Sequence, residues 1–87
     1  MNLENLRKRI DDIDEDILIL LAKRFQIVKN IQQSKSKAGL SISDKKRESH
    51  VLKRLEKLSI HLNLQFSFVK KIYNMIFLQS RIIQHDQ

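Results

Sequence analysis

The chain has 87 residues and a formal net charge of +7, with one glycine and no proline, cysteine or tryptophan. The lack of cysteine excludes disulfides, thiolate catalysis and cysteine-ligated zinc sites, and the composition is typical of an all-helical domain. The positive charge predicts attraction to anions without saying which kind. The histidines, at positions 50, 61 and 85, lack the spacing of metal ligands on a helix, so we expect no metal site.

We expect a single domain over residues 1–87, located in the cytoplasm. The N-terminus lacks the basic region and apolar run of a signal peptide. No stretch is long and apolar enough to cross a bilayer, so no membrane association is expected.

A long first helix is predicted over residues 3–38, with Gly39 as its C-cap residue. Such a helix would be about 54 Å long, whereas a compact domain of this size has a radius of gyration of ~12 Å. Its apolar residues recur at steps of three and four and form the first-helix stripe: Leu3, Leu6, Ile10, Ile13, Ile17, Leu20, Ile27 and Ile31. Further apolar residues broaden this face: Ile19, Leu21, Phe25 and Val28. One short partner helix cannot bury this stripe, so we predict an intertwined homodimer in which two long helices pack together.

Arg24 occupies a position in the first-helix stripe where the repeat predicts an apolar residue. A buried guanidinium without a partner is very costly, and no acidic residue between Asp16 and Asp44 can supply one locally. We therefore predict that Arg24 binds an anionic ligand. Lys35, eleven residues later, shares its face about 16 Å along the axis and can reach the same small ligand. Lys35 also has a simpler interpretation, as a partner of the helix dipole.

Two further helices are predicted, one from about residue 44 to 58 and one over residues 66–84. Ser43 or Asp44 can cap the second helix. The predicted inward residues of the second helix are Val51, Leu52, Leu55 and Leu58. Those of the third are Val69, Ile72, Tyr73, Ile76, Ser80, Ile83 and Gln84.

Polar residues interrupt these inward faces as well. Asp44, Arg47 and Glu48 continue the second stripe backwards, and Ser80 and Gln84 lie within the third. Each has a structural alternative: Asp44 a cap, Arg47 and Glu48 an exposed ion pair, Ser80 a packing residue bonded to its own backbone, and Gln84 a frayed end. Taken together with the cations of the first helix, they predict a polar pocket lined by cations and neutral donors.

The ordered set resembles the all-helical class of chorismate mutase: Leu6-Arg7-x-x-Ile10-Asp11-x-Ile13-Asp14, Arg24, Lys35, Asp44-x-x-Arg47-Glu48, Ser80 and Gln84. The similarity covers nearly the whole chain without a gap. Members of that family are intertwined homodimers of three-helix chains, and an arginine from the other subunit completes each active site. The resemblance assigns this role to Arg7; the alternative for Arg7 is a solvated residue paired with Asp11. Arg7 lies 17 residues before Arg24, about 25 Å along the helix, so the two cannot grip one small molecule within one chain.

The activity implied by the resemblance is the Claisen rearrangement of chorismate to prephenate, an isomerase reaction of aromatic amino acid biosynthesis that needs no cofactor. Arg7 of the partner chain and Arg24 would bind the two carboxylates of this dianion, with help from Ser80. Lys35 and Gln84 would donate hydrogen bonds to the ether oxygen.

The resemblance further implies that Glu48 and the backbone of Asp44 hold the ring hydroxyl, and that Arg47 orients Glu48 and the substrate. Isochorismate-pyruvate lyases share the fold and a similar cationic pocket; the complete Asp44, Arg47 and Glu48 set favours the mutase. A small basic helical dimer that binds nucleic acid is the alternative outside enzymology. Scattered basic residues and few aromatics argue against it, so we expect no nucleic-acid partner.

Overall fold

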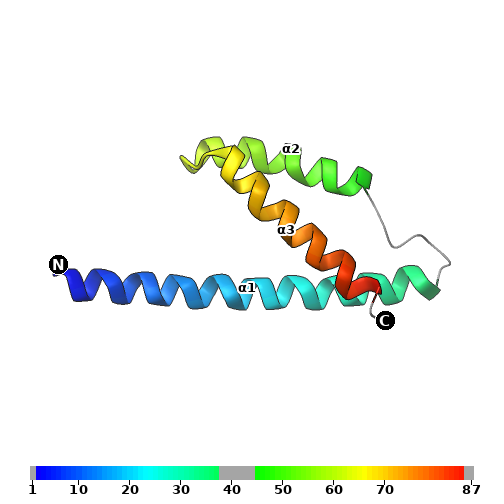
Figure 1. Cartoon of the computed structure of the whole chain (residues 1–87), viewed down its shortest axis with the longest axis horizontal. Coiled ribbons are helices and arrows are strands. Elements are labelled where there is room, and N and C mark those ends of the chain that lie inside the picture. Colours follow the sequence, from blue (N-terminus) through cyan, green and yellow to red (C-terminus); the bar gives the residue numbers. More distant parts are fainter. Residues whose placement is uncertain (1, 38–44, 86–87) are drawn as a thin grey trace.

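A computed structural model describes residues 2–37 and 45–85 of the chain and forms three helices there: α1 (Leu3–Lys37), α2 (Lys45–His61) and α3 (Phe66–His85) (Figure 1). The all-helical prediction with one very long N-terminal helix is confirmed. The predicted bounds agree to within three residues, and α2 continues past its expected end at residue 58 to His61. The predicted caps at Gly39, Ser43 and Asp44 lie outside the described residues.

The helices α2 and α3 form a hairpin, and α3 crosses back to the C-terminal half of α1 (Figure 1). The hairpin turns at Asn63, whose φ of 57° lies in the left-handed region that asparagine tolerates better than most residues. The backbone N–H of Leu64 donates to the carbonyl of Ser59 at 2.9 Å, and that of Asn63 donates to Ile60 at 3.3 Å. These two bonds make a Schellman motif, which ends α2 and sets the direction of α3.

The N-terminal part of α1 extends beyond the hairpin, and none of the described residues of α2 and α3 packs over its first turns (Figure 1). The radius of gyration is 16.2 Å, well above the ~12 Å of a compact domain of this length. Every residue of the first-helix stripe, called the α1 stripe from here on, is exposed in the single chain. A large apolar surface of this kind is typical of a protein–protein interface.

The core lies between α2 and α3, where Val51, Leu55, Val69 and Phe77 are buried. The ring of Phe77 meets that of Tyr73 edge to face, with the ring centroids 6.0 Å apart. The predicted inward faces were partly wrong for both helices. They missed Phe77, which is 5% exposed, and they placed Ile72 and Leu58 inward although both are exposed.

Ser59 takes the buried position next to Leu58, and its hydroxyl donates to the carbonyl of Leu55 at 2.7 Å. On α1 the buried residues are Val28, which belongs to the predicted broad apolar face, and Gln32, which does not; the stepped residues Ile27 and Ile31 are exposed. None of the described helices combines the length and apolar character needed to cross a membrane. The cytoplasmic location stays a prediction.

Candidate active site

A pocket of about 320 Å³ lies where α1, the first half of α2 and the last half of α3 face one another. Its size suits a small organic ligand. Its lining includes six of the site residues predicted from the sequence: Arg24, Lys35, Arg47, Glu48, Ser80 and Gln84. The rest of its wall is mostly apolar or aromatic: Ile27, Val28, Ile31, Val51, Tyr73 and Phe77. The fold therefore brings together polar residues that are up to 60 positions apart in the chain.

The remaining two predicted site residues are not part of this pocket. Arg7 is exposed near the start of α1, on the half of the helix that the hairpin does not cover. Asp44 lies outside the described residues.

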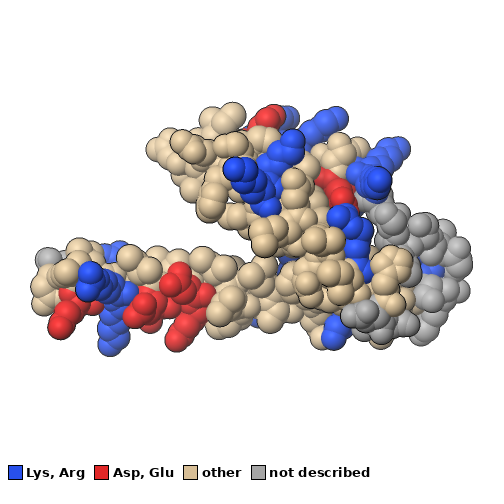
Figure 2. All heavy atoms as spheres, viewed as in Figure 1, with Lys and Arg blue, Asp and Glu red and all other residues tan. Residues whose placement is uncertain are grey.

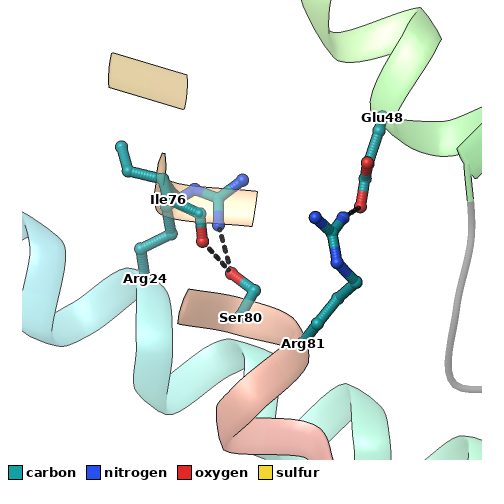
Figure 3. A network of polar contacts seen from close by, with 5 residues as sticks. All are labelled: Arg24, Glu48, Ile76, Ser80 and Arg81. Atoms are coloured by element: carbon teal, nitrogen blue, oxygen red, sulfur yellow. Dashed lines mark hydrogen bonds and ion pairs between the residues drawn. The ribbon is translucent and has the colours of Figure 1, made fainter. Parts of the chain in front are cut away.

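Arg24 reaches from α1 toward α3 (Figure 3). Its Nη1 donates a long hydrogen bond of 3.3 Å to the hydroxyl of Ser80, and its guanidinium carbon lies 5.8 and 5.9 Å from the ring centroids of Tyr73 and Phe77. Both rings are within the range of a cation–π contact. No carboxylate among the described residues pairs with Arg24, which is partly rather than fully buried. The guanidinium is thus oriented by neutral partners, and its positive charge can pair with an anionic ligand.

The Ser80 hydroxyl also donates to the carbonyl of Ile76 at 2.9 Å, one turn back in α3 (Figure 3). The structural alternative for Ser80, a bond to its own helix backbone, is therefore present together with the bond from Arg24. One hydroxyl donates once and accepts once here, and so links the Arg24 side chain to the backbone of α3.

Glu48 forms an ion pair with Arg81, a residue that the sequence interpretation missed (Figure 3). Arg81 Nη1 lies 2.6 Å from Glu48 Oε2, and the two side chains are 35% and 25% exposed. A helical signal for Arg81 existed: it follows Phe77 by four positions and precedes Gln84 by three, so it shares their face. The predicted inward face of the third helix contains neither Phe77 nor Arg81.

The charges in the pocket are strongly unbalanced. Among the described residues that line it, the cations are Arg24, Lys35, Arg47, Arg54 and Arg81, and the carboxylate of Glu48 is the only one. Figure 2 shows Lys and Arg side chains over the hairpin, whereas acidic side chains gather on the N-terminal half of α1. Such a pocket favours a ligand with more than one negative charge. The described residues contain no group of three His, Cys, Asp or Glu side chains that could hold a metal ion.

Comparison with known proteins gives a family for this architecture. The family model for chorismate mutase type II matches residues 6–85. A chorismate mutase from Methanocaldococcus jannaschii is 32% identical over 82 residues, which are 94% of this chain and 83% of that protein. No solved structure matches the chain.

Two longer relatives are named bifunctional chorismate mutase/prephenate dehydratases. That of Buchnera aphidicola subsp. Schizaphis graminum is 35% identical over 83 residues, and that of Aquifex aeolicus is 36% identical over 81 residues. The chain matches only 22% and 20% of the lengths of these two proteins, although the matches cover 95% and 93% of the chain itself.

Proposed function

Because this chain belongs to the chorismate mutase type II family, we propose that it catalyses the rearrangement of chorismate to prephenate, an isomerisation of aromatic amino acid biosynthesis. The observation that carries the proposal is the pocket that gathers Arg24, Lys35, Glu48 and Gln84 from three helices. The comparisons do not favour a lyase or a nucleic-acid-binding protein.

The reaction breaks the ether C–O bond of chorismate and forms a C–C bond in one cyclic transition state. It has no covalent intermediate, so the protein needs no nucleophile and no cofactor for it. The protein accelerates such a reaction by holding the reactive conformer and by stabilising the negative charge that grows on the ether oxygen.

Arg24 binds one of the two substrate carboxylates in our proposal. A guanidinium can bind a carboxylate with two parallel hydrogen bonds. Contacts with Ser80 and with the ring of Tyr73 hold the Arg24 guanidinium in place. The second carboxylate is bound by Arg7 of another copy of the chain.

Lys35 and Gln84 are the proposed donors to the ether oxygen. Both line the pocket, one from α1 and one from α3, so they can approach an ether oxygen from two sides. Lys35 supplies a full positive charge, and the amide of Gln84 supplies a donor that does not titrate.

The ring hydroxyl is the proposed ligand of Glu48, whose carboxylate oxygens can accept its hydrogen bond. Arg47, the residue before Glu48, also lines the pocket and is proposed to orient the substrate there. The backbone of Asp44, outside the described residues, is assigned to the same hydroxyl by the resemblance.

A homodimer is part of the proposal because the α1 stripe is exposed along the uncovered half of α1. An antiparallel pairing of two α1 helices would bury both stripes. It would also carry Arg7 of one chain toward Arg24 of the other, which a single helix keeps about 25 Å apart.

The test is a spectrophotometric assay of chorismate consumption with identification of the product. The expected product is prephenate, without added metal or cofactor. Release of pyruvate from isochorismate, with no prephenate from chorismate, would assign the pocket to the lyase reaction instead. A folded protein that converts neither compound would contradict the proposed function.

A further inference from the structure

The ion pair between Glu48 and Arg81 joins the first turn of α2 to the last turns of α3. These helix ends lie farther apart than the ends of α2 and α3 that meet at the hairpin turn (Figure 1). Both side chains line the pocket, and both are partly exposed. We infer that Arg81 is a positioning residue, which fixes the Glu48 carboxylate for the substrate hydroxyl and offsets its charge. This inference rests on the proposed function.

Fixing the carboxylate matters because a glutamate side chain has three rotatable bonds. Arg81 Nη1 lies 2.6 Å from Oε2 of Glu48, and because donor and acceptor are both charged groups, their hydrogen bond is of the strong, charge-assisted kind. Only one carboxylate oxygen is used in this contact, so Oε1 stays available to accept a bond from a hydroxyl. A carboxylate held in advance loses less rotamer freedom when the substrate binds.

Offsetting the charge matters because the proposed substrate is a dianion. Among the described residues that line the pocket, Glu48 is the one with an acidic side chain, and an unpaired carboxylate there would repel the substrate carboxylates. The guanidinium of Arg81 makes the pair neutral while the hydroxyl acceptor remains. Arg81 therefore acts on the substrate through Glu48, without a contact of its own to the reacting atoms.

A purely structural role for Arg81, tying α2 to α3, predicts a different mutational pattern. Loss of a tie between the helices lowers the free energy of unfolding, and it lowers activity only through the fraction of protein that unfolds. Loss of a positioning residue lowers kcat/KM of the fully folded protein, and only while Glu48 is a carboxylate. A double-mutant cycle on variants that circular dichroism shows to be fully folded measures this difference.

The cycle uses Arg81→Met, Glu48→Gln and the double variant, with kcat and KM measured on chorismate. We expect Arg81→Met to lower kcat/KM about tenfold in the parent and less than about twofold in the Glu48→Gln background. Arg81→Lys keeps the charge without the planar fork, so it should recover part of the loss. The matched control is Arg54→Met, which removes the same charge from the pocket lining; its effect should be equal in both backgrounds.

Equal losses from Arg81→Met in the two backgrounds, or no loss in the parent, would overturn the inference while the proposed function stands. If Arg81→Met does not fold, the same cycle run with Arg81→Lys decides in the same way. A folded but inactive parent protein removes the proposed function, and this inference with it.

Discussion

Arg24 and Ser80, 56 positions apart in the chain, meet through a hydrogen bond from the guanidinium Nη1 to the serine hydroxyl. The same hydroxyl donates to the carbonyl of Ile76, so the backbone of α3 determines where the Arg24 side chain points. A guanidinium has five N–H donors, and this bond occupies one of them. The others remain for a carboxylate ligand.

Replacing Ser80 with alanine should therefore loosen Arg24 more than it destabilises the protein. We expect Ser80→Ala to raise KM for chorismate by about fivefold, since one hydrogen bond to a partly exposed charged group is lost. Ser59→Ala is the matched control, because its hydroxyl also bonds its own helix backbone but lies outside the pocket. Equal changes in KM for the two variants would contradict a role for Ser80 in orienting Arg24.

Lys35 supplies the charge that we place next to the ether oxygen. Lys35→Ala should lower kcat by at least ~10²-fold, the typical loss for one oxyanion donor, while circular dichroism shows an unchanged helix content. Lys23→Ala removes the same charge from an exposed position of α1 and should keep parental kcat. Near-parental turnover by a folded Lys35→Ala protein would remove Lys35 from the catalytic set.

Gln84 donates through a neutral amide, so its contribution should not change with pH. In Gln84→Glu the introduced carboxyl donates only when protonated, and an unperturbed glutamate has a pKa of about 4.3. We therefore expect this variant to lose activity as pH rises toward neutral, while the parent stays active. Gln65→Glu, an exposed change at the start of α3, should give the parental pH profile. Coinciding profiles for the parent and Gln84→Glu would exclude a contact between Gln84 and the ether oxygen.

The helices were predictable because their signals are local: apolar residues at steps of three and four, and one glycine after a long run without glycine or proline. The buried face of each helix was less predictable. α3 carries apolar residues around much of its circumference, so its sequence alone does not say whether Ile72 or Phe77 meets α2. The contact with Val51 and Leu55 decides for Phe77, and it depends on residues more than 20 positions away.

Some residues of the site were likewise predictable from the sequence, and one was not. Arg24 stood out because it breaks an apolar repeat, and the family pattern pointed to the others that line the pocket. Arg81 carries a weaker mark: it lies three positions before Gln84 on the same helix face, but a basic residue on an amphipathic helix is more often solvated. Its pairing with Glu48, 33 positions earlier, arises from the hairpin geometry.

Arg7 and Arg24 are proposed to serve one site from two chains, so their variants should complement each other. Alone, Arg7→Ala and Arg24→Ala homodimers should each be nearly inactive, because every site lacks one of its two carboxylate-binding arginines. The measurement is the steady-state rate on chorismate at equal subunit concentration. Parental activity in the Arg7→Ala homodimer would reduce Arg7 to a surface residue.

Mixing the two inactive proteins tests whether their arginines meet across the interface. After equal amounts are unfolded and refolded together, random pairing makes about half of the dimers mixed. In a mixed dimer one site takes Arg24 from the Arg7→Ala chain and Arg7 from the Arg24→Ala chain, so it is complete, while the other site lacks both. One complete site in half of the dimers predicts recovery of up to roughly a quarter of parental activity, if the two sites act independently.

A mixture of Arg24→Ala with Lys35→Ala is the matched control: both residues belong to the same chain's part of the site, so no pairing makes a complete site. Recovery in the first mixture and not in the second requires that Arg7 acts in trans. No recovery in either, with mixed dimers demonstrated by mass spectrometry, would show that Arg7 and Arg24 do not share a site.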